Sequence, residues 1–309
     1  MTQQTKVIID TDPGVDDAMA IIYACLDPRI ELLGLTSIFG NVTTDIATRN
    51  ALILLELAKH KAPVAGGALK PIVQPLREPA WEVHGREGFG DVAPGIPQRS
   101  ALSEPAHEFI CRMVNENPGE IVLCPVGPLT NIALALDHDP SIANKVKSVT
   151  IMGGSLDEGG NVTSFAEANI WQDPHAADAV FAADWNVDMI GLDVTHRVTC
   201  SPEDFANLAK QAPTLGKFLN DATQFYFSFH VEANGFLGCY MHDPAAVISI
   251  IDRELFSFDV TPLNVILEGE EVGATKRATQ SDRKGVNVAM SVDADAVKHR
   301  FLEIISTGF

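Results

Sequence analysis

Four carboxylates fall within eight residues near the beginning of the chain, in the run Asp10-Thr11-Asp12-Pro13-Gly14-Val15-Asp16-Asp17. The run directly follows Val7-Ile8-Ile9, which has the apolar character of a buried strand. Carboxylates crowded in such a place repel one another and resist burial, and a hard cation such as Ca²⁺ or Mg²⁺ offsets that repulsion. The run therefore predicts a metal or proton-transfer site. The alternative is a solvated acidic turn that only caps the following helix.

Two later segments add polar side chains of a different kind. The first extends from Asn161 to Asn169 and includes Glu167, and the second is Met241-His242-Asp243-Pro244. Amide and carboxylate groups at this density suit a polyhydroxylated ligand, because they bracket hydroxyls with donors and acceptors. An imidazole titrates near neutral pH, so His242 is a candidate general acid, although a His beside an Asp can also be merely hydrogen-bonded.

Aromatic and imidazole side chains could supply a wall for a flat ring. His84 lies in the Gly-rich segment Val83-His84-Gly85-Arg86-Glu87-Gly88, where it could contact a substrate or face water. The run Phe225-Tyr226-Phe227 reads either as a stacking wall or as helix core packing. Tyr226 and Tyr240 are the expected ligand contacts, because each hydroxyl needs a partner.

The elements that must position these residues follow a β-then-α rhythm. Apolar runs at 7–9, 32–39, 121–126, 149–152 and 189–192 alternate with helical patterns at about 16–26, 48–59, from 129, 174–183 and from 202, where Ser201 is the expected cap. Strand-like runs continue over about 255–290, and 293–305 reads as a closing helix. This predicts an α/β fold in a single domain spanning 1–309: an open, mostly parallel twisted sheet with helices on both faces and a smaller C-terminal strand extension.

The candidate residues follow the carboxyl ends of these strands. Asp12, Asn41, Val126 and Met152 each come at or just after the end of a predicted strand, and Gly- and Pro-rich stretches at 66–99 and 153–166 read as long loops. In open parallel sheets that edge is where ligands bind. Distant segments are therefore expected to meet in one crevice.

Bulk composition narrows the class of partner. The formal net charge of the 309 residues is −19, which argues against nucleic acid or an anionic membrane. The five cysteines include no Cys-x-x-Cys pair, so we expect reduced core residues rather than disulfides or a zinc site. A polar start and the lack of a long apolar run favour a cytoplasmic protein acting on a small molecule.

Six short motifs, in this order along the chain, resemble those of the nucleoside hydrolases of the inosine/uridine-preferring type. The sharpest is the acidic run itself. The others are Gly40-Asn41, Val126-Gly127-Pro128-Leu129-Thr130-Asn131, Ile151-Met152-Gly153-Gly154, Ala166-Glu167-Ala168-Asn169 and His242-Asp243. The resemblance extends over nearly the whole chain.

The resemblance implies a Ca²⁺ ion held by Asp12, Asp17, Asp243 and the backbone carbonyl of Val126. Oxygen-only ligation independently fits a hard cation. The resemblance also implies that Asp12 acts as the base toward water, that His242 lies near the leaving base, and that Asn169 belongs with these catalytic residues. The base-binding residues are then expected to be His84, Tyr226 and His242.

The ribose contacts are implied in the same way. Asp16, Asn41 and Asn169 would hold the 2′- and 3′-hydroxyls, Asn161 and Glu167 the 5′-hydroxyl, and Met152 would line the pocket. The implied reaction is hydrolysis of an N-glycosidic bond by a metal-bound water, through an oxocarbenium-like state and with inversion at the anomeric carbon. Ala168 stands where many relatives have a bulky aromatic, a departure that implies a roomier or differently shaped base pocket. His242 resembles the imidazole of members acting on inosine and uridine rather than of the purine-only type, so uridine is the first expected substrate. A homodimer or homotetramer is implied as well.

Two other functions remain open on the sequence. Asp10-Thr11-Asp12 after an apolar strand also resembles the haloacid-dehalogenase-like phosphatases, which however have Gly-Thr where this chain has Pro13-Gly14. A catalytically silent ribose- and Ca²⁺-binding module is the second alternative. A calcium-sensor hand is excluded, because its obligatory loop Gly would fall on Val15.

Overall fold

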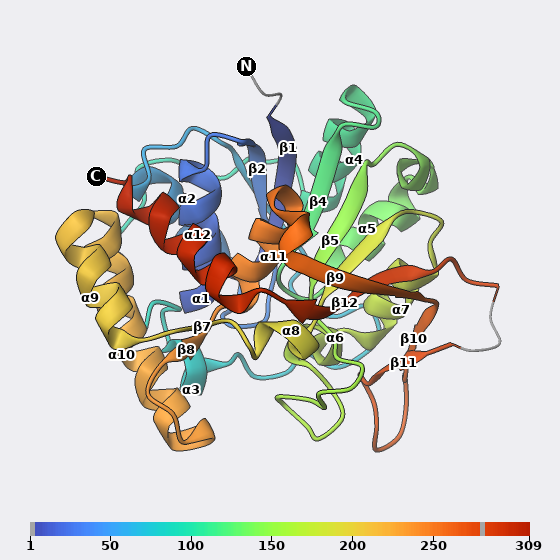
Figure 1. The fold of residues 1–309 in the computed structure, drawn as a ribbon. Helices are drawn as coiled ribbons and strands as arrows, with labels where there is room; N and C mark the ends of the chain where they lie inside the picture. Colours follow the sequence, from blue (N-terminus) through green and yellow to red (C-terminus); the bar gives the residue numbers. More distant parts are fainter. Residues whose placement is uncertain (1–3, 279–281) are drawn as a thin grey trace.

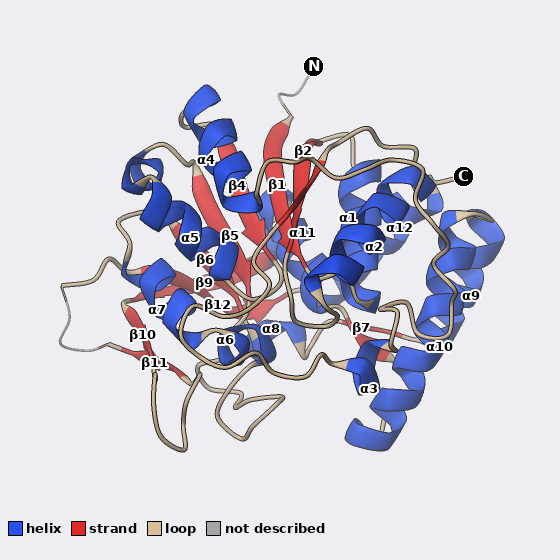
Figure 2. Ribbon diagram, turned by 180° about the vertical axis from the view of Figure 1, so that it is seen from behind, coloured by secondary structure: helices blue, strands red, loops and turns tan. Residues whose placement is uncertain are grey.

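The computed structural model describes residues 4–278 and 282–309. Its main sheet has eight strands in the order β3-β2-β1-β4-β5-β6-β12-β9 (Figures 1 and 2). Their bounds are β1 (Thr5–Thr11), β2 (Ile30–Ser37), β3 (Val64–Gly66), β4 (Ile121–Pro125), β5 (Ser148–Met152), β6 (Val187–Ile190), β9 (Phe256–Thr261) and β12 (Val286–Val292). All neighbours pair in parallel except β9, which runs antiparallel to β12 at the edge.

Helices cover both faces of this sheet (Figure 2). They are α1 (Val15–Leu26), α2 (Thr44–Leu57), α3 (Trp81–His84), α4 (Ala106–Glu116), α5 (Thr130–His138), α6 (Ala168–Gln172), α7 (Pro174–Ala182), α8 (Leu192–Thr195), α9 (Pro202–Gln211), α10 (Leu215–Asn234), α11 (His242–Ile251) and α12 (Ala294–Ser306). Two short 3₁₀ turns lie at Pro140–Asn144 and Arg253–Leu255. Two small antiparallel sheets of two strands each complete the fold: β7 (Thr199–Cys200) with β8 (Cys239–Tyr240), and β10 (Leu263–Val265) with β11 (Thr275–Arg277). The predicted fold class is confirmed.

The core forms two layers because strand side chains alternate. Val7 and Ile9 of β1 pack into one cluster with α1, α2, α11 and α12, whereas Ile8 packs into a second with α4, α5 and α7. Strands buried on both faces are continuously apolar, which is why the sequence signalled them clearly.

The strand order places a topological switch point between β1 and β4. β2 and β3 follow β1 on one side, and β4, β5 and β6 extend on the other. Loops leaving β1 and β4 therefore diverge and open a crevice at their carboxyl ends. Asp12 follows β1 and Val126 follows β4, so both lie at this point.

Several predicted boundaries were wrong by a few residues. The helix expected at 48–59 begins at Thr44, and Leu192, expected in a strand, opens α8. The stretch 66–99 is not all loop, because α3 lies within it and carries His84. Other predictions were confirmed: Ser201 caps α9 through a hydrogen bond from Asp204 N (3.3 Å), and the cysteines are unpaired, with four of them buried.

Over the described ranges, no helix is both long enough and apolar enough to cross a bilayer.

Candidate active site

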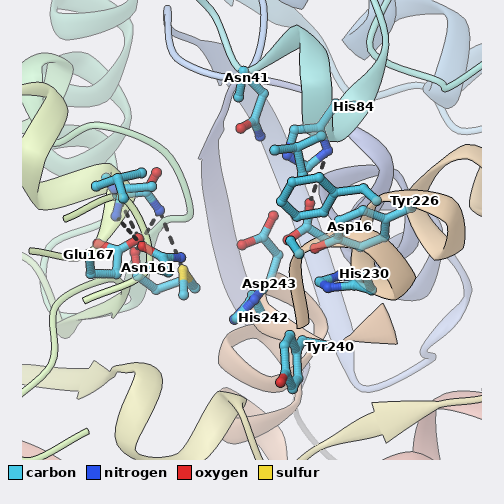
Figure 3. Close-up of a pocket in the computed structure, with 18 of the residues that line it drawn as sticks. Asp16, Asn41, His84, Asn161, Glu167, Tyr226, His230, Tyr240, His242 and Asp243 are labelled. Atoms are coloured by element: carbon cyan, nitrogen blue, oxygen red, sulfur yellow. Dashed lines mark hydrogen bonds and ion pairs between the residues drawn. The ribbon is translucent and has the colours of Figure 1, made fainter. Parts of the chain in front are cut away.

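A cavity of about 380 Å³ opens at the carboxyl ends of β1, β4 and β5. One side is polar and includes Asn161 and Glu167, whereas Asp16 lies across the cavity beside His84 (Figure 3). The opposite side carries rings, among them His84 and Tyr226. The cavity thus has a half suited to hydroxyl groups and a half suited to a flat ring.

Asp17 is fixed in place at the first turn of α1. Its Oδ1 accepts from Thr11 Oγ1 (2.5 Å) and Asp12 N (3.2 Å), and its Oδ2 accepts from Gly14 N (2.9 Å) and Asn41 Nδ2 (2.9 Å). A carboxylate near a helix N-terminus is favoured by the helix dipole and by free N–H groups. The acidic run therefore both begins the helix and supplies the site.

Asp12 lies against the loops that follow β2 and β4. Its Oδ2 accepts from Asn41 N (2.6 Å), whereas its Oδ1 is buried without a hydrogen-bond partner in the described chain. A Cβ at Gly127 would lie 2.4 Å from Oδ1, and one at Gly40 would lie 2.1 Å from Oδ2. Both positions therefore require glycine, and the Gly40-Asn41 and Val126-Gly127 motifs owe part of their form to this contact.

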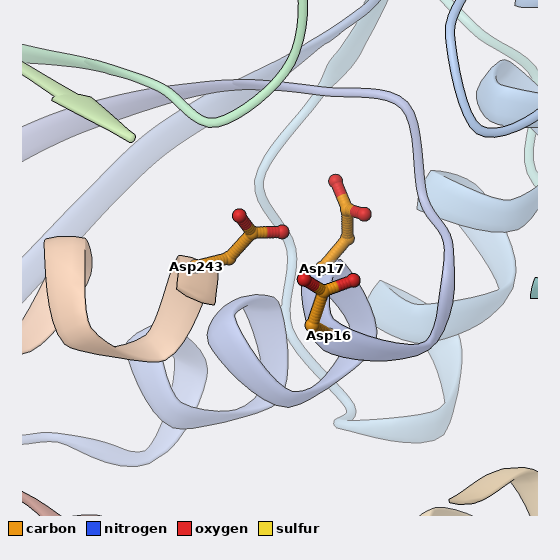
Figure 4. Close-up of side chains that lie close together, drawn as sticks. All are labelled: Asp16, Asp17 and Asp243. Carbon is orange, nitrogen blue, oxygen red and sulfur yellow. The ribbon is translucent and has the colours of Figure 1, made fainter. Parts of the chain in front are cut away.

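Three carboxylates meet at the centre of the site. One oxygen each from Asp16, Asp17 and Asp243 lie within 4.8 Å of one another, although α1 and α11 are far apart in sequence (Figure 4). All three are buried, and Asp16 Oδ1 has no hydrogen-bond partner among the described residues. Of the expected ligands Asp12, Asp17 and Asp243, the last two belong to this group together with Asp16, and Asp12 lies outside it.

Burial and mutual repulsion raise the pKa of these carboxyls. Desolvation is the largest cause for Asp12, Asp16 and Asp243. The next cause is repulsion by Asp17 for Asp12 and for Asp16, and the pKa of Asp16 rises to about 8. For Asp243 the next cause is repulsion by Asp16. A hard divalent cation among them would offset both penalties and use the unpartnered oxygens. The donor set is all oxygen, as Ca²⁺ and Mg²⁺ prefer. The residues present therefore fit such an ion.

Glu167 and Asn169 organise the polar half. Glu167 caps α6, accepting from Asn169 N (2.9 Å), Ile170 N (3.1 Å) and Gly154 N (2.9 Å). Asn169 Nδ2 donates to the carbonyls of Val126 (2.9 Å) and Met152 (3.1 Å), so its Oδ1 remains available to a ligand. Asn161 Oδ1 accepts from Ala168 N (2.9 Å), which joins the 153–166 loop to α6.

The ring half is a chain of neighbouring side chains. Ring centroids of Tyr226 lie 5.4 Å from His84 and 4.5 Å from His230, and Tyr240 lies 5.1 Å from His230 and 5.4 Å from His242. Such spacings are those of interacting aromatic pairs. Tyr226 is therefore part of a wall, whereas Phe227 beside it packs into the core.

Burial keeps most of these imidazoles neutral. Desolvation lowers the pKa of His84 to about 3 and of His230 to about 4, and it lowers the pKa of His242 well below its ordinary value. His84 Nδ1 accepts from Val15 N (3.2 Å), which requires an unprotonated nitrogen. The expectation that His242 titrates near neutral pH does not hold for the ring as it is buried here. The burial of His242 could not be predicted from the sequence.

The structure brings nearly all the predicted site residues to one cavity. The following line it directly: Asp16, Asn41, His84, Val126, Met152, Asn161, Glu167, Asn169, Tyr226, Tyr240, His242 and Asp243. Asp12 and Asp17 lie just behind, bonded to Asn41. Sequence reasoning missed His196 and His230. His230 follows Tyr226 by one helical turn, a spacing that indicates the same face, whereas His196 carried no such signal.

Comparisons with known proteins agree with this geometry. The family model described as inosine-uridine preferring nucleoside hydrolase matches residues 7–299. Uridine nucleosidase 1 of Arabidopsis thaliana is 40% identical over 303 residues, covering 94% of this chain and 90% of that protein. The non-specific ribonucleoside hydrolase RihC of Salmonella typhi is 36% identical, covering 99% of each.

A solved structure gives the same result for the fold. The purine-preferring ribonucleoside hydrolase from Gardnerella vaginalis superposes with a TM-score of 0.94 at 36% identity, covering 98% of each chain. The relatives' names thus include uridine, non-specific and purine-preferring enzymes.

Proposed function

Because this chain belongs to the inosine-uridine preferring nucleoside hydrolase family and is a nucleoside hydrolase, we propose that it cleaves the N-glycosidic bond of uridine in preference to purine ribosides, with Ca²⁺ as its ion. The observation that carries the metal part is the meeting of buried Asp16, Asp17 and Asp243 oxygens within 4.8 Å, beside the unpartnered Oδ1 of Asp12. The phosphatase alternative has no comparable support, since the family match spans residues 7–299.

Asp17 and Asp243, which lie in one group with Asp16, would hold the ion, and Asp12 and the carbonyl of Val126 are the other proposed ligands. When bound, the ion supplies positive charge that lowers the pKa of a coordinated water and orients the vicinal hydroxyls of a ribose. Asp12 Oδ1 has no hydrogen-bond partner among the described residues and is the proposed acceptor of the proton from water.

The polar half orients the sugar. Asn169 Oδ1, Asn41 and Asp16 are the proposed partners of the 2′- and 3′-hydroxyls, and Asn161 and Glu167 of the 5′-hydroxyl. Anionic groups around the ring also stabilise the positive charge that develops on the sugar as the base departs. Water attacking opposite the base, in one displacement, gives inversion at the anomeric carbon.

The ring half receives the base. His84, Tyr226 and His242 are the proposed contacts, and the wall they share with His230 and Tyr240 suits a flat heterocycle. The preference for uridine rests on the names of the plant relatives and on His242 in the ring half.

The test is a panel of purine and pyrimidine ribosides in which free ribose is measured, with Ca²⁺ and after chelation. We expect ribose and uracil from uridine, the largest kcat/KM for uridine, and loss of most activity on chelation, restored by Ca²⁺. An unchanged rate after exhaustive chelation would remove the metal assignment. Tight ribose binding without base release would instead favour the silent module.

A further inference from the structure

His242 has a partner that neither the acidic cluster nor the ring wall explains. Thr195 Oγ1 lies 2.8 Å from His242 Nδ1. Thr195 is fully buried, and His242 is 8% exposed. Thr195 is the last residue of the short helix α8. The backbone N–H of Thr195 donates to Gly191 O (3.1 Å), which fixes the backbone that carries the hydroxyl.

The direction of this hydrogen bond follows from the surroundings of the hydroxyl. A neutral imidazole has one donor and one acceptor nitrogen, and a hydroxyl can act as either. His242 Nδ1 is the sole hydrogen-bond partner found for Thr195 Oγ1 within residues 4–278 and 282–309. If Nδ1 carried the proton, the buried hydroxyl hydrogen would lack an acceptor, which is costly. The satisfied arrangement has Thr195 donating to Nδ1.

The consequence falls on the opposite ring nitrogen. With Nδ1 as acceptor, the single proton of the neutral ring is on Nε2, and His242 lines the cavity. The rings of Tyr240 (5.4 Å) and His196 (5.6 Å) pack around the imidazole and limit its rotation. An Nε2–H donor is what a departing base needs, because negative charge develops on it as the bond breaks.

We propose that Thr195 is a positioning residue for the hydrolysis, whose hydroxyl holds His242 in the tautomer that presents Nε2–H to the leaving base. The inference rests on the proposed function, since it assigns the base to the His242 side of the cavity. Asp243, the next residue, belongs to the acidic cluster, so the ring is also fixed by its place at the start of α11.

The experiment compares two substrates in Thr195→Val, which keeps the shape and removes the hydroxyl. Uridine requires stabilisation of its leaving group, whereas 4-nitrophenyl riboside releases a phenolate that needs no proton. We expect kcat for uridine to fall about tenfold, with KM and the rate on the nitrophenyl riboside changed by less than about twofold. Thr195→Ser is expected to restore uridine turnover to within about threefold of the original.

Two further measurements separate positioning from structure. In a His242→Ala background, Thr195→Val is expected to add no further loss, because the residue acts only through the imidazole. Nitrogen-15 spectra of labelled histidine should show a protonated Nε2 and a bare Nδ1 for His242. Thr223→Val is the matched control: Thr223 is fully buried in α10 and bonds only to Asn220 O (3.0 Å) among the described residues.

Each result decides the matter in one direction. Equal losses on both substrates, additive losses in the double variant, or a proton found on Nδ1 would overturn the role of Thr195 while leaving the hydrolase itself intact. An unaltered protein that cleaves neither riboside would instead refute the proposed function. Unchanged uridine turnover in Thr195→Val also counts against the inference.

Discussion

The two carboxylate oxygens of Asp12 differ in their hydrogen bonding. Oδ2 is held by Asn41 N at 2.6 Å, and Oδ1 is buried with no hydrogen-bond partner in the described part of the chain. A buried oxygen without a partner is costly, so a role in which it binds an ion or takes a proton explains its retention. Asp17, with both oxygens bonded, holds the helix start in place as well as facing the other carboxylates.

Asp12→Asn should separate these roles clearly. We expect kcat on uridine to fall by roughly three orders of magnitude or more, since the change removes both the base and one charge from the ion site. Steady-state kinetics and calorimetric titration with Ca²⁺ measure the two effects. Asp137→Asn, at an exposed position of α5, is the control and should change neither. Near-normal turnover in Asp12→Asn would contradict its assignment as base.

Residue patterns predicted the polar half of the site better than the ring half. The acidic run and Asn41 were identifiable because they follow strand ends, where ligands bind in open parallel sheets, and the role of Asn169 on α6 came from the family resemblance. His196 comes from the C-cap of α8, and its approach to Tyr240 (4.6 Å between ring centroids) depends on how distant elements pack. No local spacing encodes such a contact.

At the scale of elements, α1 connects the site to the rest of the molecule. Its first turn holds Asp16 and Asp17, and its C-terminal end is tied to α11 through Arg29, which pairs with Asp27 (2.7 Å) and Asp252 (2.7 Å). The two carboxylates are nearly inaccessible, whereas the Arg29 side chain is 32% exposed. Removing the cation would leave Asp27 with Tyr23 Oη (2.8 Å) and Asp252 with Arg300 (3.1 Å), so each buried anion would lose one of its two side-chain partners.

Arg29→Leu is therefore expected to lower the free energy of unfolding by about 2 kcal/mol, less than for a fully buried pair because water partly screens Arg29. Urea denaturation measures this, and kcat of the folded protein should be unchanged. The control is Arg112→Leu, whose partners Glu104 and Glu116 are on the surface, with an expected loss below about 0.5 kcal/mol. Equal losses in the two variants would show that burial does not matter at Arg29.

The helices and strands could be predicted where burial gave the sequence a clear apolar pattern. Parallel strands buried on both faces gave clear apolar runs, so β1, β4 and β5 were placed almost correctly. Boundaries shifted where polar turns begin a helix, as at Thr44, because Thr-Asp starts carry no apolar periodicity. The four-residue α3 is too short to show a helical period at all.

At the scale of the whole molecule, the stability of the metal-free protein should depend on pH. The pKa of Asp16 is raised to about 8, above the value near 4 of an unfolded carboxyl. The folded state therefore binds more protons than the unfolded state between about pH 4 and pH 8, and stability falls as pH rises through that window. The buried imidazoles have the opposite effect. Because the pKa of His84 is lowered to about 3, its contribution to the stability of the folded protein decreases as the pH falls below about 6.5.

Calcium separates the two effects. A bound ion replaces the protons on the clustered carboxyls and leaves the imidazoles as they were, so the stabilisation by Ca²⁺ should be small near pH 5 and grow toward pH 8. At a free Ca²⁺ concentration fixed at about 100 times the Kd measured at pH 8, the stabilisation at that pH should be about 2.7 kcal/mol. Scanning calorimetry with and without Ca²⁺ at each pH measures this difference. A calcium increment that is constant or shrinks as pH rises would refute it.

His242 and Asp243 are consecutive, yet one belongs to the ring wall and the other to the carboxylate cluster. A single peptide bond at the start of α11 therefore joins the proposed base contact to the proposed ion site. Substitutions along α10 would change the ring wall, whereas substitutions at His84 on α3 would also reach the start of α1, because His84 Nδ1 accepts from Val15 N (3.2 Å). A displacement of α11 would move both residues at once, so the position of this helix links the fit of the base to the geometry of the ion site.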